Sequence, residues 1–169
     1  GNSETRVLVQ SGKGRSGLIR QRLVTLSNMF SQITEGYEVP EAYTDEDSYI
    51  FRTPEGELYG NGLLVEREFS MGSLRPTSLD PKPTSKVTML SIQRAFFEGY
   101  RILGEMERCS PKSLDVTWKV VFLLPPNDIT DGAKVLYDRI SKLKEINFVF
   151  PEFHAELKIA SVQAYSEGF

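Results

Sequence analysis

The sequence predicts an α+β fold, in which a mainly antiparallel sheet is covered by at least two helices within a single compact domain. Three observations support this prediction. The chain has 169 residues, 40% of them hydrophobic and 25% charged, which is enough apolar material for one core. Residues 114–124 alternate as a strand does, and residues 133–146 carry an apolar stripe at helical spacing.

Composition separates two regions of the chain. Residues 1–17 are a basic, glycine-rich N-terminal segment, and residues 18–169 are the single domain, with an acidic loop at 35–48. Residues 1–34 carry five basic side chains and one acid, a charge of +4, although the whole chain carries −3. Residues 35–57 carry eight acids and one arginine, a charge of −7. Either these segments are solvated surfaces that partly neutralise each other, or the basic one meets an anionic partner. The second interpretation assigns anion binding to Lys13, Arg15, Arg20 and Arg22.

The first regular element that the pattern predicts is a helix over residues 18–33. Apolar residues from Ile19 to Ile33 recur at spacings of four and three, which places them on one helical face. Gly36 would end this helix, and residues 37–48 are polar and acidic without either period. We therefore expect an exposed loop there.

A hairpin is expected next. Residues 49–53 alternate, residues 54–56 supply turn chemistry, and residues 58–69 resume an extended pattern with a bulge or second turn at 60–62. Three prolines make residues 75–83 an extended connector.

Residues 87–106 fit two structures. A helix would place five apolar residues on one stripe, but Gly99 and Gly104 would each cost about 1 kcal/mol relative to alanine. Two strands turning at Gly99 would place apolar residues on alternating faces. We favour the two strands.

The C-terminal third has the clearest patterns. Residues 114–124 predict a long central strand with Trp118 in the middle of its buried face, under the helix at 133–146. That helix ends in lysines, which suit the negative end of the helix dipole. Residues 154–164 are expected to return as the final strand.

One motif matches known binding chemistry. Residues 12–17 read Gly-Lys-Gly-Arg-Ser-Gly, which fits G-x-G-x-x-G, and in a dinucleotide site such glycines let backbone amides approach a pyrophosphate. A nucleotide- or dinucleotide-binding enzyme that uses Gly12, Gly14 and Gly17 is therefore the alternative function. The acid that should end a second strand about 20 residues later is missing.

No set of catalytic or metal-binding residues converges in the sequence, so we expect no enzyme, cofactor or metal. His154 is the only histidine and Cys109 the only cysteine, which excludes an internal disulfide and a Cys/His zinc site. No apolar run approaches the roughly 18 residues of a membrane-spanning helix, and no secretory signal is visible. An intracellular location, in the cytoplasm or on a membrane surface, is expected.

The acidic loop is a candidate docking segment. Tyr37, Pro40 and Tyr43 lie in it, and such a segment can bind a partner as a short linear motif. A simpler interpretation concerns the neighbouring tyrosines: Tyr49 and Tyr59 pair across the hairpin.

The order of segments resembles matrix proteins of negative-strand RNA viruses such as rhabdoviruses. A short basic segment precedes the acidic loop with Tyr37-Glu38-Val39-Pro40-Glu41-Ala42-Tyr43, and a compact α+β core follows. The Pro-Pro-x-Tyr motif of that family is missing, and the basic arm is weaker. The resemblance implies a non-enzymatic protein that self-associates and links a nucleoprotein to a membrane.

The function predicted from these observations is a non-enzymatic, matrix-like assembly or interaction protein. It is expected to self-associate and to contact an anionic membrane surface, RNA or nucleoprotein through its basic N-terminal segment, while another protein is a further partner.

Overall fold

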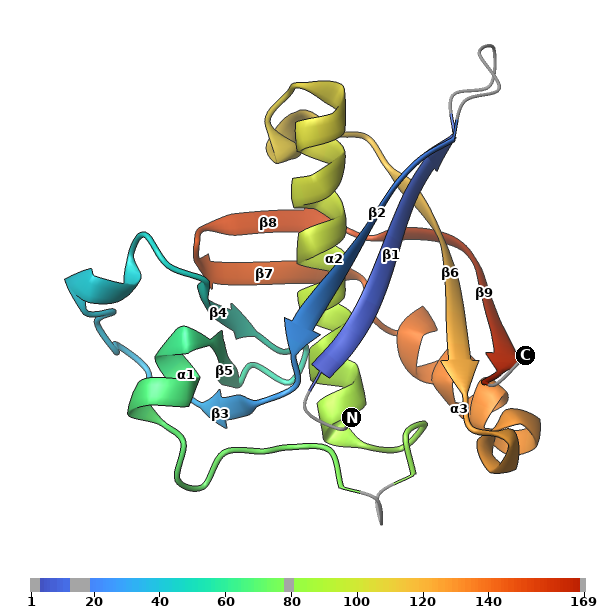
Figure 1. Cartoon of the computed structure of the whole chain (residues 1–169), viewed down its shortest axis with the longest axis horizontal. Helices are drawn as coiled ribbons and strands as arrows, with labels where there is room; N and C mark the ends of the chain where they lie inside the picture. The colour runs from blue at the N-terminus through green and yellow to red at the C-terminus, as the bar shows by residue number, and fades with distance from the viewer. Residues whose placement is uncertain (1–3, 13–18, 78–80, 168–169) are drawn as a thin grey trace.

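The computed structural model describes residues 4–12, 19–77 and 81–167, and its central element is the long helix α2 (Figure 1). Phe97 of this helix stacks on Phe148 of β7, with 4.4 Å between ring centroids. Ile102, five residues further along, packs with Val9 of β1 in a second apolar cluster. The helix therefore supports strands on two of its faces. In chain order the elements are β1 (Glu4–Gly12), β2 (Ile19–Ser27), β3 (Phe30–Gln32), η1 (Glu41–Tyr43), β4 (Ser48–Arg52), β5 (Leu58–Gly62), α1 (Leu63–Glu68), α2 (Lys86–Glu107), η2 (Pro111–Ser113), β6 (Thr117–Leu124), η3 (Pro126–Asp128), α3 (Ile129–Ser141), β7 (Glu145–Phe150), β8 (Phe153–Glu156) and β9 (Lys158–Ser166).

The strands of the described residues form three sheets, and together with the helices they make a single compact α+β domain, as predicted. Strands β3-β5-β4-β7-β8 make an antiparallel sheet, and β1-β2 make an antiparallel hairpin. The pair β6-β9 is parallel, an exception to the mainly antiparallel pattern that the sequence predicts.

The helix predicted over residues 18–33 is wrong, because β2 and β3 occupy most of this stretch. Val24 and Leu26 point toward the core, whereas Ile19 and Leu23 are 67% and 63% exposed. The spacing of four and three had grouped apolar residues that lie on opposite faces of a strand. Pairing with β1 over nine residues decides the structure, and the apolar spacing within residues 18–33 does not show this pairing.

The hairpin β4-β5 confirms the prediction, although the chain then enters α1 where an extended segment was expected. Gly62 at this junction has a φ of 91°, and a Cβ there would lie only 2.2 Å from the carbonyl oxygen of Asp47. Glycine is therefore required for the strand to turn into the helix. Tyr49 lies opposite Asn61, and Tyr59 opposite Phe51, so the two tyrosines do not form the predicted pair.

Residues 87–106 form one helix, so the favoured pair of strands is wrong. The two glycines that counted against a helix have a packing reason. A Cβ at Gly99 would lie 2.6 Å from Cη2 of Trp118, and one at Gly104 would lie 3.0 Å from the carbonyl oxygen of Cys109. Close approach of these neighbours offsets the low helix propensity of glycine.

Strand β6 exists as predicted, but it pairs with β9 alone among the described strands and is not central. Trp118 is half-buried against Gly99 of α2, whereas the sequence had placed it under the C-terminal helix. That helix is α3, which begins at Ile129 and buries Leu136 and Ile140. The predicted final strand is divided into β8 and β9 at Leu157, whose N–H donates to the carbonyl oxygen of Lys144.

Candidate functional site

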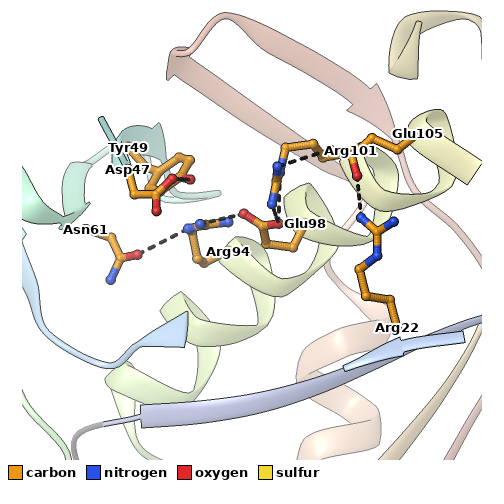
Figure 2. A network of polar contacts seen from close by, with 8 residues as sticks. All are labelled: Arg22, Asp47, Tyr49, Asn61, Arg94, Glu98, Arg101 and Glu105. Carbon is orange, nitrogen blue, oxygen red and sulfur yellow. Dashed lines mark hydrogen bonds and ion pairs between the residues drawn. The ribbon is translucent and has the colours of Figure 1, made fainter. Parts of the chain in front are cut away.

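A buried ion pair on α2 is the most unusual polar feature of the described core (Figure 2). Arg94 and Glu98 lie one turn apart, which brings Nη2 of the arginine to 2.6 Å from Oε1 of the glutamate. Their side chains are only 4% and 2% exposed. Two buried charges are tolerated only where further contacts compensate for lost hydration.

Strands β4 and β5 supply those contacts to Arg94. Its guanidinium lies 3.5 Å from the ring centroid of Tyr49, a cation–π contact, and its Nε donates to Oδ1 of Asn61 at 3.2 Å. The Asn61 amide in turn donates to the backbone oxygens of Ser27 and Met29, 2.9 Å from each. These contacts fix α2 against the five-stranded sheet and against the bend between β2 and β3.

The second oxygen of Glu98 continues the network toward the surface. Arg101 donates to it from Nε at 2.9 Å and from Nη2 at 2.6 Å, and its Nη1 reaches Glu105 at 3.3 Å. Glu105 also binds Arg22 of β2. Figure 2 shows this row of alternating charges running along α2 from β5 to the hairpin β1-β2. We call these residues, Arg22, Tyr49, Asn61, Arg94, Glu98, Arg101 and Glu105, the α2 network.

Burial of this network changes the pKa of the Tyr49 phenol. Desolvation raises the pKa of its phenol to about 12, against the nearby positive charge of Arg94, which lowers it. Its hydroxyl donates to Oδ1 of Asp47 at 3.2 Å. The phenol therefore stays protonated over the whole physiological range.

The α2 network connects helix α2 to strands β2, β4 and β5. It holds no thiol, no serine or threonine hydroxyl and no imidazole, and each of its carboxylates is paired with arginine. Among the described residues, no group of three or more His, Cys, Asp or Glu side chains is arranged to hold a metal ion. Sequence reasoning missed this network, although an arginine within residues 90–97, five of which are apolar, was an available signal.

Two of the predicted anion-binding residues form ion pairs with glutamates of the same chain. Arg20 and Arg22 lie on the face of β2 that meets α2, where Arg20 pairs with Glu107 at 2.6 Å and Arg22 pairs with Glu105. Lys13 and Arg15 lie outside the described residues, as do Gly14 and Gly17. The motif at residues 12–17 stands between two antiparallel strands, so the strand–helix unit of a dinucleotide site is not formed.

The predicted docking residues hold the acidic loop in place. Tyr43 is buried and its hydroxyl donates to Glu68 at 2.7 Å, while the ring of Tyr37 packs edge-on against Phe69. Pro40 is exposed, and the loop's carboxylates lie around it in the sequence. The loop therefore exposes carboxylates to solvent while its tyrosines anchor it to the domain.

The remaining chemical candidates lie apart from one another. His154, on β8, is exposed and lies 2.8 Å from Glu145. Cys109 is exposed beside an open hollow of about 400 Å³, whose lining includes Arg101 and Arg108. A second hollow, of about 250 Å³, lies beside β8. Within residues 4–12, 19–77 and 81–167, no helix is long and apolar enough to cross a membrane.

Comparison with known proteins gives likenesses of structure alone. No protein-family model matches the chain, and no curated protein matches it. The filament structure of AlfA from B. subtilis plasmid pLS32 matches with a TM-score of 0.64 and 10% identity, over 99% of this chain and 54% of that chain. Ta0583, an archaeal actin homologue, matches with a TM-score of 0.57 and 12% identity, over 87% of this chain and 40% of that one. The apo pSK41 ParM protein matches with a TM-score of 0.55 and 12% identity, over 96% of this chain and 49% of that one.

These likenesses establish that the chain shares its fold with part of these actin-like proteins. The chain spans about half of the length of the solved chains it matches. The resemblance to viral matrix proteins is therefore wrong, and so is the matrix-like function predicted with it. The order of a basic segment, an acidic loop and an α+β core is too general to distinguish the two folds.

Proposed function

We propose that this chain is a self-associating, actin-like protein whose copies join into filaments. The observation that carries the proposal is the match of nearly the whole chain to AlfA, a protein whose structure was solved as a filament. Fold likeness alone does not transfer function, so the proposal needs a physical basis in this chain and a direct test.

The contacts of the α2 network support the proposal. In a regular filament every copy is related to the next by the same rotation and translation. The two contact surfaces of one subunit must therefore keep a constant orientation relative to each other. The α2 network ties β4 and β5 to one helix through a buried ion pair and its contacts, and it ties β2 to the same helix through the exposed pair Arg22–Glu105.

Exposed apolar side chains also support self-association. Leu8 and Leu23 lie opposite each other on the outer face of β1-β2 and are 52% and 63% exposed. Leu123 and Tyr165 lie opposite each other on β6-β9 and are similarly exposed. Each pair is a candidate centre for an apolar contact with another copy.

High-speed pelleting followed by negative-stain electron microscopy tests the proposal. The purified chain is examined over a range of concentrations, with Mg²⁺ alone and with Mg²⁺ plus ATP or GTP. We expect protein to enter the pellet above a critical concentration and to form linear filaments in at least one of these conditions. A chain that stays in the supernatant throughout, and shows no filaments, would contradict the proposal.

The prediction that the chain is not an enzyme stays a prediction, which the same samples check. It rests on the lack of a convergent nucleophile, base and metal set in the sequence. We expect phosphate release from ATP and GTP to remain at the background of a protein-free sample. Release that grows with protein concentration would show that the prediction is wrong.

A further inference from the structure

We infer that copies of this chain join head to tail, with the acidic segment of one copy bound to the exposed face of α3 on the next. The acidic segment is the acidic loop at residues 35–48, and the α3 face comprises Lys134 and Tyr137 of α3 together with Lys142 and Lys144, which follow its last residue. The inference rests on the proposed function for the identity of the partner, a second copy. It adds which two surfaces meet.

The acidic segment carries six carboxylates and no basic residue. Glu35 pairs with Arg52 at 2.6 Å, Glu46 pairs with Arg67 at 3.0 Å, and Asp47 accepts the Tyr49 hydroxyl. The other three carboxylates are exposed and form no ion pair with any residue that the structure describes. They belong to Glu38, Glu41 and Asp45.

The backbone that carries these three carboxylates is anchored by neighbouring tyrosines. Tyr43 anchors the segment through its buried ring and its bond to Glu68, and its N–H donates to the carbonyl oxygen of Pro40 to close the turn η1. Tyr37 anchors the preceding residues against Phe69. A preorganised surface loses less conformational entropy on binding than a mobile one.

The α3 face offers the complementary charge. Lys134, Lys142 and Lys144 are exposed, and within the described parts of the chain none of them forms an ion pair. Tyr137 is 53% exposed beside them and provides an aromatic contact of the kind enriched at interfaces. Asp131 and Asp138 are also exposed on this helix, so the lysines alternate with acids along it.

Arg139, the other basic residue of α3, contacts the backbone of the same chain. Arg139 turns inward and donates to the backbone oxygens of Pro83 and Ser85, at 2.7 Å and 3.1 Å. The three lysines are therefore the positive charges of this helix and its C-terminal end that remain available to a partner.

The placement of the two surfaces favours a second copy as the occupant. Figure 1 shows η1 and α3 at opposite ends of the molecule's longest axis, so the charges cannot neutralise each other within one chain. Between copies they can, and a contact between two different surfaces repeats without closing when successive copies are related by translation along that axis. Opposite charges would also orient the copies as they meet.

Charge reversal tests this contact sharply. One variant carries Glu38→Lys with Glu41→Lys, and the other carries Lys134→Glu with Lys142→Glu. Alone, each variant sets like charges against each other at every contact, and we expect its critical concentration for pelleting to rise at least about tenfold. Mixed in equal amounts, the two variants again set opposite charges together at each contact. We expect the mixture to pellet at a critical concentration close to that of the wild type.

Matched controls keep the same change in net charge at exposed sites elsewhere. Glu152→Lys with Glu156→Lys, and Lys112→Glu with Arg75→Glu, should assemble as the wild type does. Recovery of assembly in the mixture also shows that both variants are folded.

The outcomes separate this inference from the proposed function. If the wild type assembles and each reversed variant assembles equally well alone, another surface joins the copies, and the inference is overturned while the proposed function stands. Failure of the mixture to recover likewise overturns the inference. If the wild type itself does not assemble in any condition, the proposed function fails, and the inference fails with it.

Discussion

Gly99 lies where α2 meets β6, and its missing side chain makes room for Trp118. The six-membered ring of Trp118 occupies the space that a Cβ would need, and the tryptophan also packs edge-on against Phe96 and Tyr100. One absent methyl group thus determines how closely β6 approaches the helix.

Replacing Gly99 with alanine should therefore destabilise the protein, although alanine is the better helix former. We expect a loss of about 1–3 kcal/mol in the free energy of unfolding, because the Trp118 ring must move away. Urea unfolding measures the loss, and the tryptophan emission should shift to the red. In a Trp118→Leu background the same change should instead stabilise, by up to about 1 kcal/mol. Destabilisation of equal size in both backgrounds would contradict the explanation.

Tyr49 gives the stability a dependence on alkaline pH. Its pKa is about 12 in the folded chain, because burial disfavours the phenolate, against an ordinary value of 10.0. The unfolded chain therefore loses this proton first, so the free energy of unfolding should fall as the pH rises from about 10 to about 12. In Tyr49→Phe, chemical unfolding should show a smaller fall over that range. Tyr137→Phe, at an exposed position, is the control and should behave as the wild type does.

At the scale of the elements, local patterns predicted the structure where local contacts determine it. The hairpin β4-β5 and the helix α3 follow from turn residues and from an amphipathic stripe within one segment. Strand β2 and helix α2 were mispredicted because contacts with other segments, which the apolar spacing within each does not show, decide them. The hairpin partner β1 makes β2 a strand, and Trp118 of β6 explains Gly99 of α2.

The buried pair on α2 is the element-scale feature with the largest expected cost of disruption. Glu98→Gln leaves the charge of Arg94 buried without its carboxylate, which should lower the free energy of unfolding by about 3–5 kcal/mol. Glu105→Gln removes a carboxylate that is 46% exposed, and should cost no more than about 1 kcal/mol. Thermal or urea unfolding of both variants checks the difference. Equal costs would mean that burial does not determine the strength of this network.

Arg94→Met combined with Glu98→Leu should recover much of that loss, because apolar residues of similar size remove both desolvated charges at once. A double variant as unstable as Glu98→Gln would show that Tyr49 and Asn61 depend on the arginine itself.

At the scale of the whole molecule, the sequence predicted the candidate surface but not its partner. The acidic loop was recognised as a docking segment from its charge and its tyrosines, and the structure shows those tyrosines anchoring the loop. The α3 face could not be found in the same way, because its lysines suit the end of any helix. Only the fold places it at the far end of the longest axis from η1 (Figure 1).

The central claim is open, head-to-tail self-association, and sedimentation velocity over a wide concentration range tests it most directly. An open assembly keeps adding copies, so we predict that the mean sedimentation coefficient rises continuously with concentration and that added salt reverses the rise. A coefficient that stays at the monomer value, or that saturates at the value of a closed dimer, would contradict the account.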